Sequence, residues 1–325
     1  MTYSVAIRTL GTSHGTLRRE LESIHKQTVQ PERICIYIAE GYPIPDFKIG
    51  REEYFPVKKG MVSQRALQYD EISSDCILML DDDVELAPDS AERLLKQMEE
   101  SGADCMAADT FKNHEMGFKG KLRAAVTGLV FPRFNQKWAF KIHSNDSFSY
   151  INNPKKDYYP SMSAAGPCSL WKKDAFLNIH YEDEIWLDQL EFAYGDDGLF
   201  FYKLYVNGGR LFVSFNNGVK NLDAKSASKK YQEDPKKLYY RAYSNYLRWY
   251  RMHNNLLIGR KKIENNIIFS IKLTWVGMIH TMLSICSMSS GPLLYYLKGN
   301  LEAYRFCRTK EYKLIPCFKL QKLLY

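Results

Sequence analysis

Two apolar segments, joined by a stretch with helical periodicity, constrain the fold of this chain more than any other feature. Residues 4–10 are rich in β-branched and apolar side chains, and residues 34–39 (Ile-Cys-Ile-Tyr-Ile-Ala) form an unbroken apolar run. Between them, Leu17, Leu21 and Ile24 recur at helical spacing. Unbroken apolar strands are typical of parallel sheets that helices cover on both faces. The pattern therefore predicts an α/β fold, Rossmann-like, with a mainly parallel central sheet flanked by helices.

The alternation of helices and strands continues toward residue 110. Four further elements are predicted: a helix over 63–71, a buried strand over 76–80, a helix over 88–100 with Pro88 in its first turn, and a strand over 104–108. Residues 111–160 are rich in Phe, Tyr, Lys and Asn, and for them no element is predicted. In a sheet of this type, ligands gather at the carboxyl ends of the strands.

Three consecutive carboxylates, Asp81-Asp82-Asp83, follow directly on the predicted strand 76–80. They repel one another, and the end of a strand offers them no i,i+4 partner of the kind found on helices. A cation removes the repulsion, because Mg²⁺ and Mn²⁺ prefer oxygen ligands and are commonly held by one or two carboxylates plus substrate phosphates. The alternative is a solvated acidic turn. The position at the carboxyl end of a buried strand favours the ligand site.

The positive charge of the chain is concentrated in its C-terminal third. The 325 residues carry a formal net charge of +8. From Ala224 onward, 19 Lys and Arg stand against 5 Asp and Glu, a net charge of +14, which leaves −6 for residues 1–223. Such an excess favours an anionic partner, either nucleic acid or the anionic cytoplasmic face of a membrane. The apolar segments of the same region favour the membrane, so no nucleic-acid partner is expected.

Aromatic, basic and apolar stretches follow one another in this region. Residues 239–252 interleave aromatic side chains with arginines, Arg260-Lys261-Lys262 come next, and residues 267–288 are apolar enough to consider as a transmembrane helix. Lys272, His280 and several Ser and Thr residues oppose a transmembrane helix. An amphipathic helix in the membrane interface is the preferred interpretation.

The N-terminus has no signal-peptide pattern, and the seven cysteines stand singly, without a close pair suited to zinc or to a disulfide framework. A reducing cytoplasm fits this composition, and secretion is not expected. Together with the basic C-terminal third, these features predict a cytoplasmic protein that is peripheral on the inner face of the cell membrane.

Several short motifs occur in a fixed order. They are Thr9 after the first strand, Glu40-Gly41 after the second, Ser63-Gln64-Arg65, Leu80-Asp81-Asp82-Asp83, Gly166 to Trp171, and Gly195-Asp196-Asp197. In this order and spacing the chain, from about Ser4 to Asp223, resembles the family 2 glycosyltransferases of the bacterial polysaccharide type, which have the GT-A fold and invert the anomeric centre. The resemblance makes the acidic run an Asp-x-Asp motif.

On the donor side, the resemblance implies roles residue by residue. Asp83 resembles the direct metal ligand, and Asp81 a donor contact that shares in the metal site. Asp82, which stands between them, and Thr9, which follows the first strand, are also expected to bind the donor. Glu40 stands where the family places an acid that contacts the nucleotide base. Arg65 is expected to face donor phosphate or base, with a solvated arginine on a helix surface as the alternative.

On the acceptor side, Gly166 to Trp171 resembles the family's strand that begins with glycine. Asp196-Asp197 resembles the family's acidic motif at the start of a helix. Asp197 matches the general base of the family. An acid that only stabilises the positive end of the helix dipole is the alternative. Such a base is needed because a sugar hydroxyl is a poor nucleophile near neutral pH.

One departure from the family pattern is expected to weaken metal binding. The family often supplies a histidine just beyond the late strand that here spans 210–214, whereas residues 217–223 contain none. Lys220 or Asn221 is the candidate to replace it, with Lys220 expected to neutralise donor phosphate.

Taken together, the sequence predicts an inverting, Mg²⁺- or Mn²⁺-dependent glycosyltransferase that uses a nucleotide-diphosphate sugar. Its acceptor is expected to be a saccharide or a polyprenyl-diphosphate-linked saccharide of surface polysaccharide biosynthesis. Three regions are expected: 1–110 for the nucleotide sugar, 111–223 for the acceptor, and 224–325 as a basic helical extension that associates with membranes.

There are three alternative interpretations of the sequence. A prenyl-diphosphate enzyme also uses an aspartate-rich metal motif, but on long helices of all-α folds. A nucleotidyltransferase needs a glycine-rich, lysine-bearing phosphate loop, which residues 11–15 do not provide. A non-catalytic nucleotide-sugar-binding protein of the same fold is the third, and it differs from the enzyme only in turnover.

Overall fold

A computed structural model describes residues 1–325 except 113–116, 127–136, 152, 192–193, 223–234 and 319–325. Its centre is an eight-stranded sheet with the order β3-β2-β1-β4-β10-β6-β11-β9. All neighbours from β3 to β4 are parallel, as are β6 and β11, while β10 and β9 run antiparallel to their neighbours. The strands are β1 (Tyr3–Thr9), β2 (Ile34–Ala39), β3 (Glu52–Val57), β4 (Cys76–Asp81), β6 (Cys105–Ala108), β9 (Tyr158–Pro160), β10 (Cys168–Lys172) and β11 (Leu211–Ser214). The predicted α/β fold with a mainly parallel sheet is confirmed.

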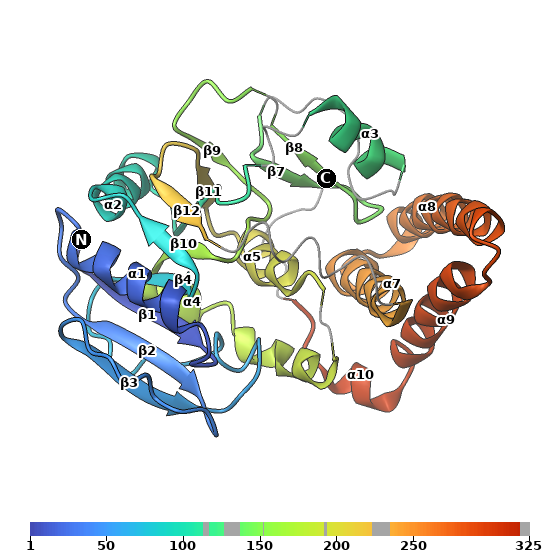
Figure 1. Ribbon diagram of the computed structural model, residues 1–325. Helices are drawn as coiled ribbons and strands as arrows, with labels where there is room; N and C mark the ends of the chain where they lie inside the picture. The colour runs from blue at the N-terminus through green and yellow to red at the C-terminus, as the bar shows by residue number, and fades with distance from the viewer. Residues whose placement is uncertain (113–116, 127–136, 152, 192–193, 223–234, 319–325) are drawn as a thin grey trace.

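Helices cover both faces of this sheet (Figure 1). Successive side chains of a strand point to opposite faces, so Leu78 and Leu80 of β4 join one core and Ile77 and Met79 the other. The first core includes side chains of α1 (His14–His25) and α2 (Ser90–Ser101). The second includes side chains of α4 (Lys173–Leu177), the 3-10 helix η2 (Tyr181–Gln189) and α5 (Asp196–Val206). Burial on both faces explains why these strands are continuous apolar runs.

Two local predictions are wrong. Residues 63–71 form turns rather than a helix, because the Asp188 carboxylate accepts hydrogen bonds from the backbone N–H groups of Val62 and Ser63 and fixes an irregular loop. Pro88 lies before α2, whose N-cap residue is Asp89, and not within its first turn.

Residues 111–160, for which no element was predicted, contain several short ones. They are α3 (Phe118–Val126) and the antiparallel pair β7 (Phe140–Ile142) and β8 (Phe148–Tyr150), in addition to β9. A second small antiparallel pair joins β5 (Val84–Leu86) to β12 (Val219–Asn221), next to the acidic run. These elements are too short for the helical or strand periodicity of apolar residues to be visible in the sequence.

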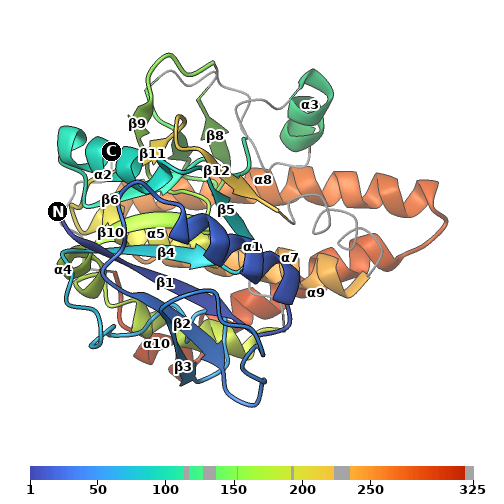
Figure 2. The ribbon, with the colours of Figure 1, turned by 60° about the vertical axis from the view of Figure 1, so that its left-hand side comes forward.

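The C-terminal part is helical, as predicted. It consists of α7 (Pro235–Trp249), a π-helical turn η3 (Tyr250–Asn254), α8 (Gly259–Cys286), α9 (Gly291–Phe306) and α10 (Lys310–Leu314). Figure 2 shows α8 and α9 side by side, extending away from the sheet. By length and composition, α8 is apolar enough to cross a membrane. The predicted boundary between Asp223 and Ala224 lies outside the described residues.

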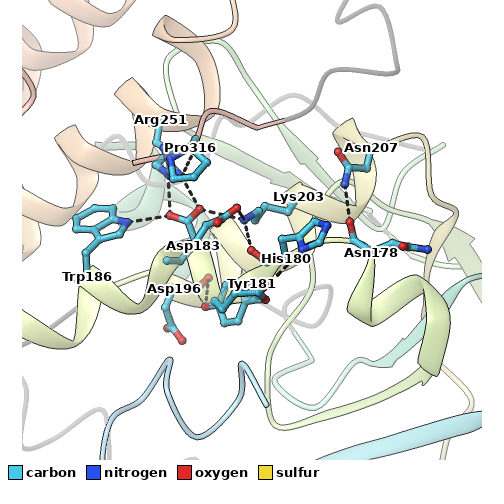
Figure 3. A network of polar contacts seen from close by, with 12 residues as sticks. Asn178, His180, Tyr181, Asp183, Trp186, Asp196, Lys203, Asn207, Arg251 and Pro316 are labelled. Carbon is cyan, nitrogen blue, oxygen red and sulfur yellow. Dashed lines mark hydrogen bonds and ion pairs between the residues drawn. The ribbon is translucent and has the colours of Figure 1, made fainter. Parts of the chain in front are cut away.

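A buried ion-pair network ties this helical part to the sheet domain (Figure 3). The Arg251 guanidinium donates to both carboxylate oxygens of Glu184, at 2.7 and 2.6 Å, and to the Pro316 carbonyl at 2.7 Å. Lys203 of α5 adds a 3.2 Å ion pair to Glu184. Arg251 and Glu184 are at most 1% exposed, so this pair is part of the core.

Candidate active site

The antiparallel pairing of β10 with β4 brings the acidic run close to the start of α5. The Asp81 backbone N–H donates to the Pro167 carbonyl at 3.0 Å. One residue earlier, the Gly166 N–H donates to Asp197 Oδ2 at 3.2 Å. The Gly166-Pro167 turn therefore separates two groups of carboxylates that lie more than a hundred residues apart in the sequence.

The first group opens into a cavity of about 420 Å³ at the carboxyl ends of β1 and β4. Asp81 is ion-paired with Arg8, whose Nε lies 2.6 Å from Asp81 Oδ1. Asp82 Oδ2 accepts a 2.5 Å hydrogen bond from Thr9 Oγ1. The lining consists of Arg8, Thr9, Leu10, Thr12, Ser13, Lys59, Gly60, Met61, Gln64 and Asp81 to Asp83. Two cations and three acids in one cavity suit a ligand that carries both phosphate and a metal.

Burial perturbs the acids of this cavity. It raises the pKa of Asp82 above its ordinary value, and the hydrogen bond from Thr9 opposes that shift. Behind the run, the fully buried Glu20 of α1 has a pKa well above the ordinary value, first because of burial and then because of the nearby Asp82, Asp81 and Asp83 charges.

The acidic run can supply only some of the ligands that a divalent cation needs. Within the described residues, no group of three or more His, Cys, Asp or Glu side chains is placed to hold a metal ion. Asp81 and Asp82 already accept hydrogen bonds, from Arg8 and Thr9. Two carboxylates completed by phosphate oxygens and water remain a normal Mg²⁺ or Mn²⁺ environment. The expected ligands Asp83 and Asp81 are therefore compatible with a metal that arrives with its diphosphate.

The second group of carboxylates surrounds one arginine. Arg65 Nη1 lies 2.6 Å from Asp197 Oδ1 and 3.1 Å from Asp196 Oδ2. The side chains of Arg65 and Asp196 are 3% and 10% exposed, whereas that of Asp197 is 32% exposed. Burial, followed by the Asp197 charge, raises the pKa of Asp196 to about 6. Asp197 is thus the acid of the pair that solvent and a substrate can reach.

The prediction that Arg65 contacts the donor is not supported by its position. Arg65 is buried under Asp196 and Asp197, and its guanidinium lies 4.9 Å from the Phe200 ring centroid. The loop that carries it is fixed by Asp188, and the Gln64 amide donates to the Thr9 and Tyr37 carbonyls at 2.9 and 3.2 Å. Arg65 therefore holds the second group of carboxylates in place.

Two positions beside Asp197 require glycine because neither has room for a Cβ atom. A Cβ atom on Gly166 would lie 2.1 Å from Asp197 Oδ1 and 2.7 Å from Arg65 Nη2. At Gly195, the N-cap of α5, φ is +83°, and a Cβ would lie 2.0 Å from Arg248 Nη1 of α7. The acceptor-side glycine predicted at 166 thus has a steric role against the carboxylate itself.

Other predicted residues lie elsewhere. Trp171 is fully buried, stacked on Phe201 at 5.7 Å between ring centroids, so it is a core residue that no acceptor can touch. Glu40 is exposed in the turn after β2, outside the residues that line the cavity. Lys220 is exposed on β12 and is not among the lining residues either, although the neighbouring Leu222 N–H donates to the Asp83 carbonyl at 2.8 Å.

Sequence reasoning missed Arg8 and Lys59. Arg8 is the register partner of Asp81 across β1 and β4, so the alignment of these two strands would have indicated the pair. Lys59 lies in a loop between β3 and the irregular segment that follows, and no local pattern marks it.

The sheet order, the carboxylates after β4 and the acids that open α5 define an α/β protein of the GT-A class. Residues 44–179 match the family Glycosyl transferase family 2, which is the family that the sequence predicted. None of the curated proteins compared with it matches significantly. The prediction of a glycosyltransferase is thereby confirmed at the level of the family.

Two solved structures are similar to this chain, and the first of them supports the fold. TarS of S. aureus, residues 1–349, crystallised with UDP, is 11% identical, with a TM-score of 0.50 over 95% of this chain and 93% of that chain. GalNAc-T7, crystallised with UDP, GalNAc and Mn²⁺, is 15% identical, with a TM-score of 0.48 over 76% of this chain. This chain spans about half, 51%, of the GalNAc-T7 chain.

Proposed function

We propose that this protein is an inverting glycosyltransferase that moves a sugar from a nucleotide-diphosphate sugar to a hydroxyl of a saccharide acceptor. The observation that carries the proposal is the pair of carboxylate groups on the two sides of the Gly166-Pro167 turn, one at a cavity with cations and one beside it. An inverting displacement requires the leaving group and the base on opposite sides of the anomeric carbon. Two separated carboxylate groups meet that requirement.

The cavity after β1 and β4 is proposed to bind the donor. The UDP in the TarS structure, which has a similar fold, supports a nucleoside diphosphate as the ligand. Arg8 and Lys59 carry charge suited to phosphate, and Thr9 orients Asp82. Asp83, with Asp81, would hold Mg²⁺ or Mn²⁺ together with the phosphates. When bound, such a cation supplies Lewis-acid stabilisation of the leaving diphosphate.

Asp197 is proposed as the general base. It is the solvent-accessible acid of the second group, and the Gly166 N–H and Arg65 fix its two oxygens. These two contacts hold the carboxylate in one orientation. Asp196, more deeply buried, is proposed to share the negative charge of the site rather than to touch the acceptor.

The acceptor is proposed to be a saccharide, free or linked to a polyprenyl diphosphate, in surface polysaccharide biosynthesis. This part rests on the C-terminal third, whose net charge of +14 would attract an anionic carrier and the inner face of the cell membrane. The protein is accordingly proposed to be cytoplasmic and peripheral on that membrane. Glu40 and Lys220 remain proposed donor contacts, with the base and a phosphate respectively.

A panel of nucleotide sugars, assayed for hydrolysis and transfer with Mn²⁺, tests the proposal. At least one donor should be hydrolysed by the wild-type protein, and Asp197→Asn should remove turnover while leaving nucleotide binding intact. Glu99→Gln, an acid on the surface helix α2, is the control. Nucleotide binding without turnover for every donor would contradict the enzyme and favour a non-catalytic binding protein.

A further inference from the structure

The long helix α8 has two faces of different character. Its inner face packs on the protein: Phe269 stacks on Trp249 with ring centroids 3.7 Å apart and an interplanar angle of 3°. At the middle of the helix, Lys272 Nζ donates to the carbonyls of Asn145 and Asp146 at 2.9 and 3.1 Å. Further along, the Leu273 carbonyl accepts from the Tyr296 hydroxyl of α9 at 2.8 Å. The helix is therefore docked on the domain over its central turns.

Its outer face is a continuous apolar stripe. Large hydrophobic side chains recur every three or four residues, which places them on one side of a helix, and each is between 49 and 65% exposed: Ile263, Ile267, Ile271, Trp275, Met278 and Met282. The same face forms an open groove of about 560 Å³, in which Asn266, Ser270 and Thr274 are the polar lining residues. A contiguous exposed apolar surface of this kind marks an interaction site.

The helix α3 extends this surface. Phe118, Leu122 and Val126 are spaced four residues apart and are 80, 54 and 39% exposed. The Trp275 indole N–H donates to the Val126 carbonyl at 3.1 Å, which joins the end of α3 to the middle of α8. Figure 2 shows α3 above α8 on the same side of the molecule. The surface therefore combines an element of the acceptor half with the C-terminal helix.

The charge next to this surface selects the partner. Arg260-Lys261-Lys262 form the first turn of α8 directly before Ile263, and the Arg260 side chain is 93% exposed. Lys119 is exposed on α3. A stripe of large apolar side chains bordered by basic residues fits the interface of an anionic bilayer, where apolar groups enter the acyl boundary and cations meet the headgroups.

We infer that the outer stripe of α8 and the apolar face of α3 together insert into one leaflet of an anionic membrane, with α8 parallel to the membrane plane. A spanning orientation would require α8 to leave the domain and would carry Lys272 into hydrocarbon without the two carbonyls that now bind it. The open groove on the outer face fits acyl chains. This inference rests on the membrane placement in the proposed function and adds the inserted surface and its orientation.

Vesicle binding of the 325-residue protein tests the surface. Binding to phosphatidylcholine vesicles that contain phosphatidylglycerol should exceed binding to phosphatidylcholine alone and should weaken with salt. The double variant Ile271→Asp/Trp275→Asp, and separately Leu122→Asp on α3, should each reduce binding roughly tenfold or more, as expected for removing buried apolar area and adding like charge to the headgroup layer. Ile44→Asp, an exposed apolar residue beside the sheet, is the matched control and should bind like wild type.

Depth measurements test the orientation. With Cys286 and Cys317 replaced, single nitroxide-labelled cysteines at positions 263, 271 and 282 report their depth in the bilayer. A helix in the membrane plane gives the same shallow depth at all three. A spanning helix separates the outer two by about 28 Å, from a rise of 1.5 Å per residue, and that gradient would overturn the inference.

The outcomes separate this inference from the proposed function. Unchanged vesicle binding in the α8 and α3 variants, or self-association through this face in solution, would overturn the membrane surface even if donor hydrolysis persists. Loss of binding with hydrolysis of a water-soluble donor intact would support it. Failure of every nucleotide sugar to react would contradict the proposed function and leave the vesicle result valid.

Discussion

Arg65 Nη1 lies 2.6 Å from Asp197 Oδ1, and this ion pair joins the loop after β3 to the start of α5 across 132 residues of sequence. Arg65 also contacts Asp196, so one buried guanidinium bridges two adjacent acids. Asp197, the proposed base, is therefore held by a buried residue of a distant loop.

Arg65→Lys should lower kcat and leave the KM for the donor nearly unchanged, because the lysine keeps the charge but lacks the planar guanidinium whose Nη1 contacts both carboxylates. Arg65→Met should in addition destabilise the fold by about 3–5 kcal/mol, as expected when one partner of a buried ion pair is removed. Steady-state kinetics and chemical denaturation measure the two effects. Arg33→Lys, in the exposed pair with Glu53, is the control, with an effect within about 1 kcal/mol. A raised donor KM in Arg65→Lys would instead indicate a donor contact.

Asp196→Asn should change how stability depends on pH. The pKa of Asp196 is raised to about 6 in the folded protein, above the value of about 3.9 for an unfolded aspartate. The folded state therefore binds more protons than the unfolded state between pH 4 and 6, and this group lowers stability as the pH rises through that window. The melting temperature of Asp196→Asn, relative to that of the wild type, should therefore rise progressively from pH 4 to 6.5. Parallel curves for the two proteins would show that Asp196 is not perturbed.

Gly166→Ala should abolish transfer and spare nucleotide binding. The added Cβ would lie 2.1 Å from Asp197 Oδ1, so the carboxylate must move away from the acceptor. Isothermal titration with UDP and a transfer assay separate the two effects. Gly15→Ala on α1 is the matched control, since a Cβ there meets nothing within 4 Å and alanine stabilises a helix by roughly 0.5–1 kcal/mol relative to glycine. Transfer at the wild-type rate in Gly166→Ala would exclude Asp197 from the chemistry.

Asp83→Asn should remove the dependence of nucleotide binding on Mn²⁺. Loss of a direct ligand should cost more than the roughly tenfold to hundredfold effect of losing a supporting residue. Titration of UDP with and without Mn²⁺ measures it. Asp89→Asn, at an exposed pair before α2, should keep the Mn²⁺ dependence. If wild-type binding is already independent of Mn²⁺, then Arg8 and Lys59 serve as the cations of the site.

Arg248→Met should impair catalysis from a distance. Arg248 donates to both oxygens of the buried Asp146 at 2.9 and 2.6 Å, and it packs against Gly195 at the start of α5. Its removal leaves the buried Asp146 carboxylate without the guanidinium and loosens the residues next to Asp197. Both stability and kcat should therefore fall. Arg241→Met, an exposed arginine of the same helix that lies over Tyr194, is the comparison. Equal effects of the two variants would refute a specific role for Arg248.

The sequence predicts the strands of this fold better than it predicts the site. Buried parallel strands are unbroken apolar runs, so β2 and β4 can be recognised locally, and the acids that follow β4 are found with them. The role of Arg65 is different, because its partners lie more than a hundred residues away and its loop is shaped by Asp188. The helix predicted over residues 63–71 is wrong because the carboxylate that shapes this loop is distant in the sequence and no local pattern reveals it. The prediction of Trp171 as an acceptor-side residue failed for a related reason. The motif places Trp171 near the site, but the alternation of side chains along the strand points it into the core.

The buried pair of Arg251 and Glu184, closed by the Pro316 carbonyl, limits how this chain can be modified. A membrane-binding tail joined by a flexible linker can be deleted, shortened or exchanged between proteins. Here the helices that carry the apolar surface share their core with the domain that carries the acids. Deletion after residue 223 would expose that core, so the whole chain should melt in one cooperative transition. Engineering of its localisation must then proceed by replacing surface side chains and not by exchanging domains.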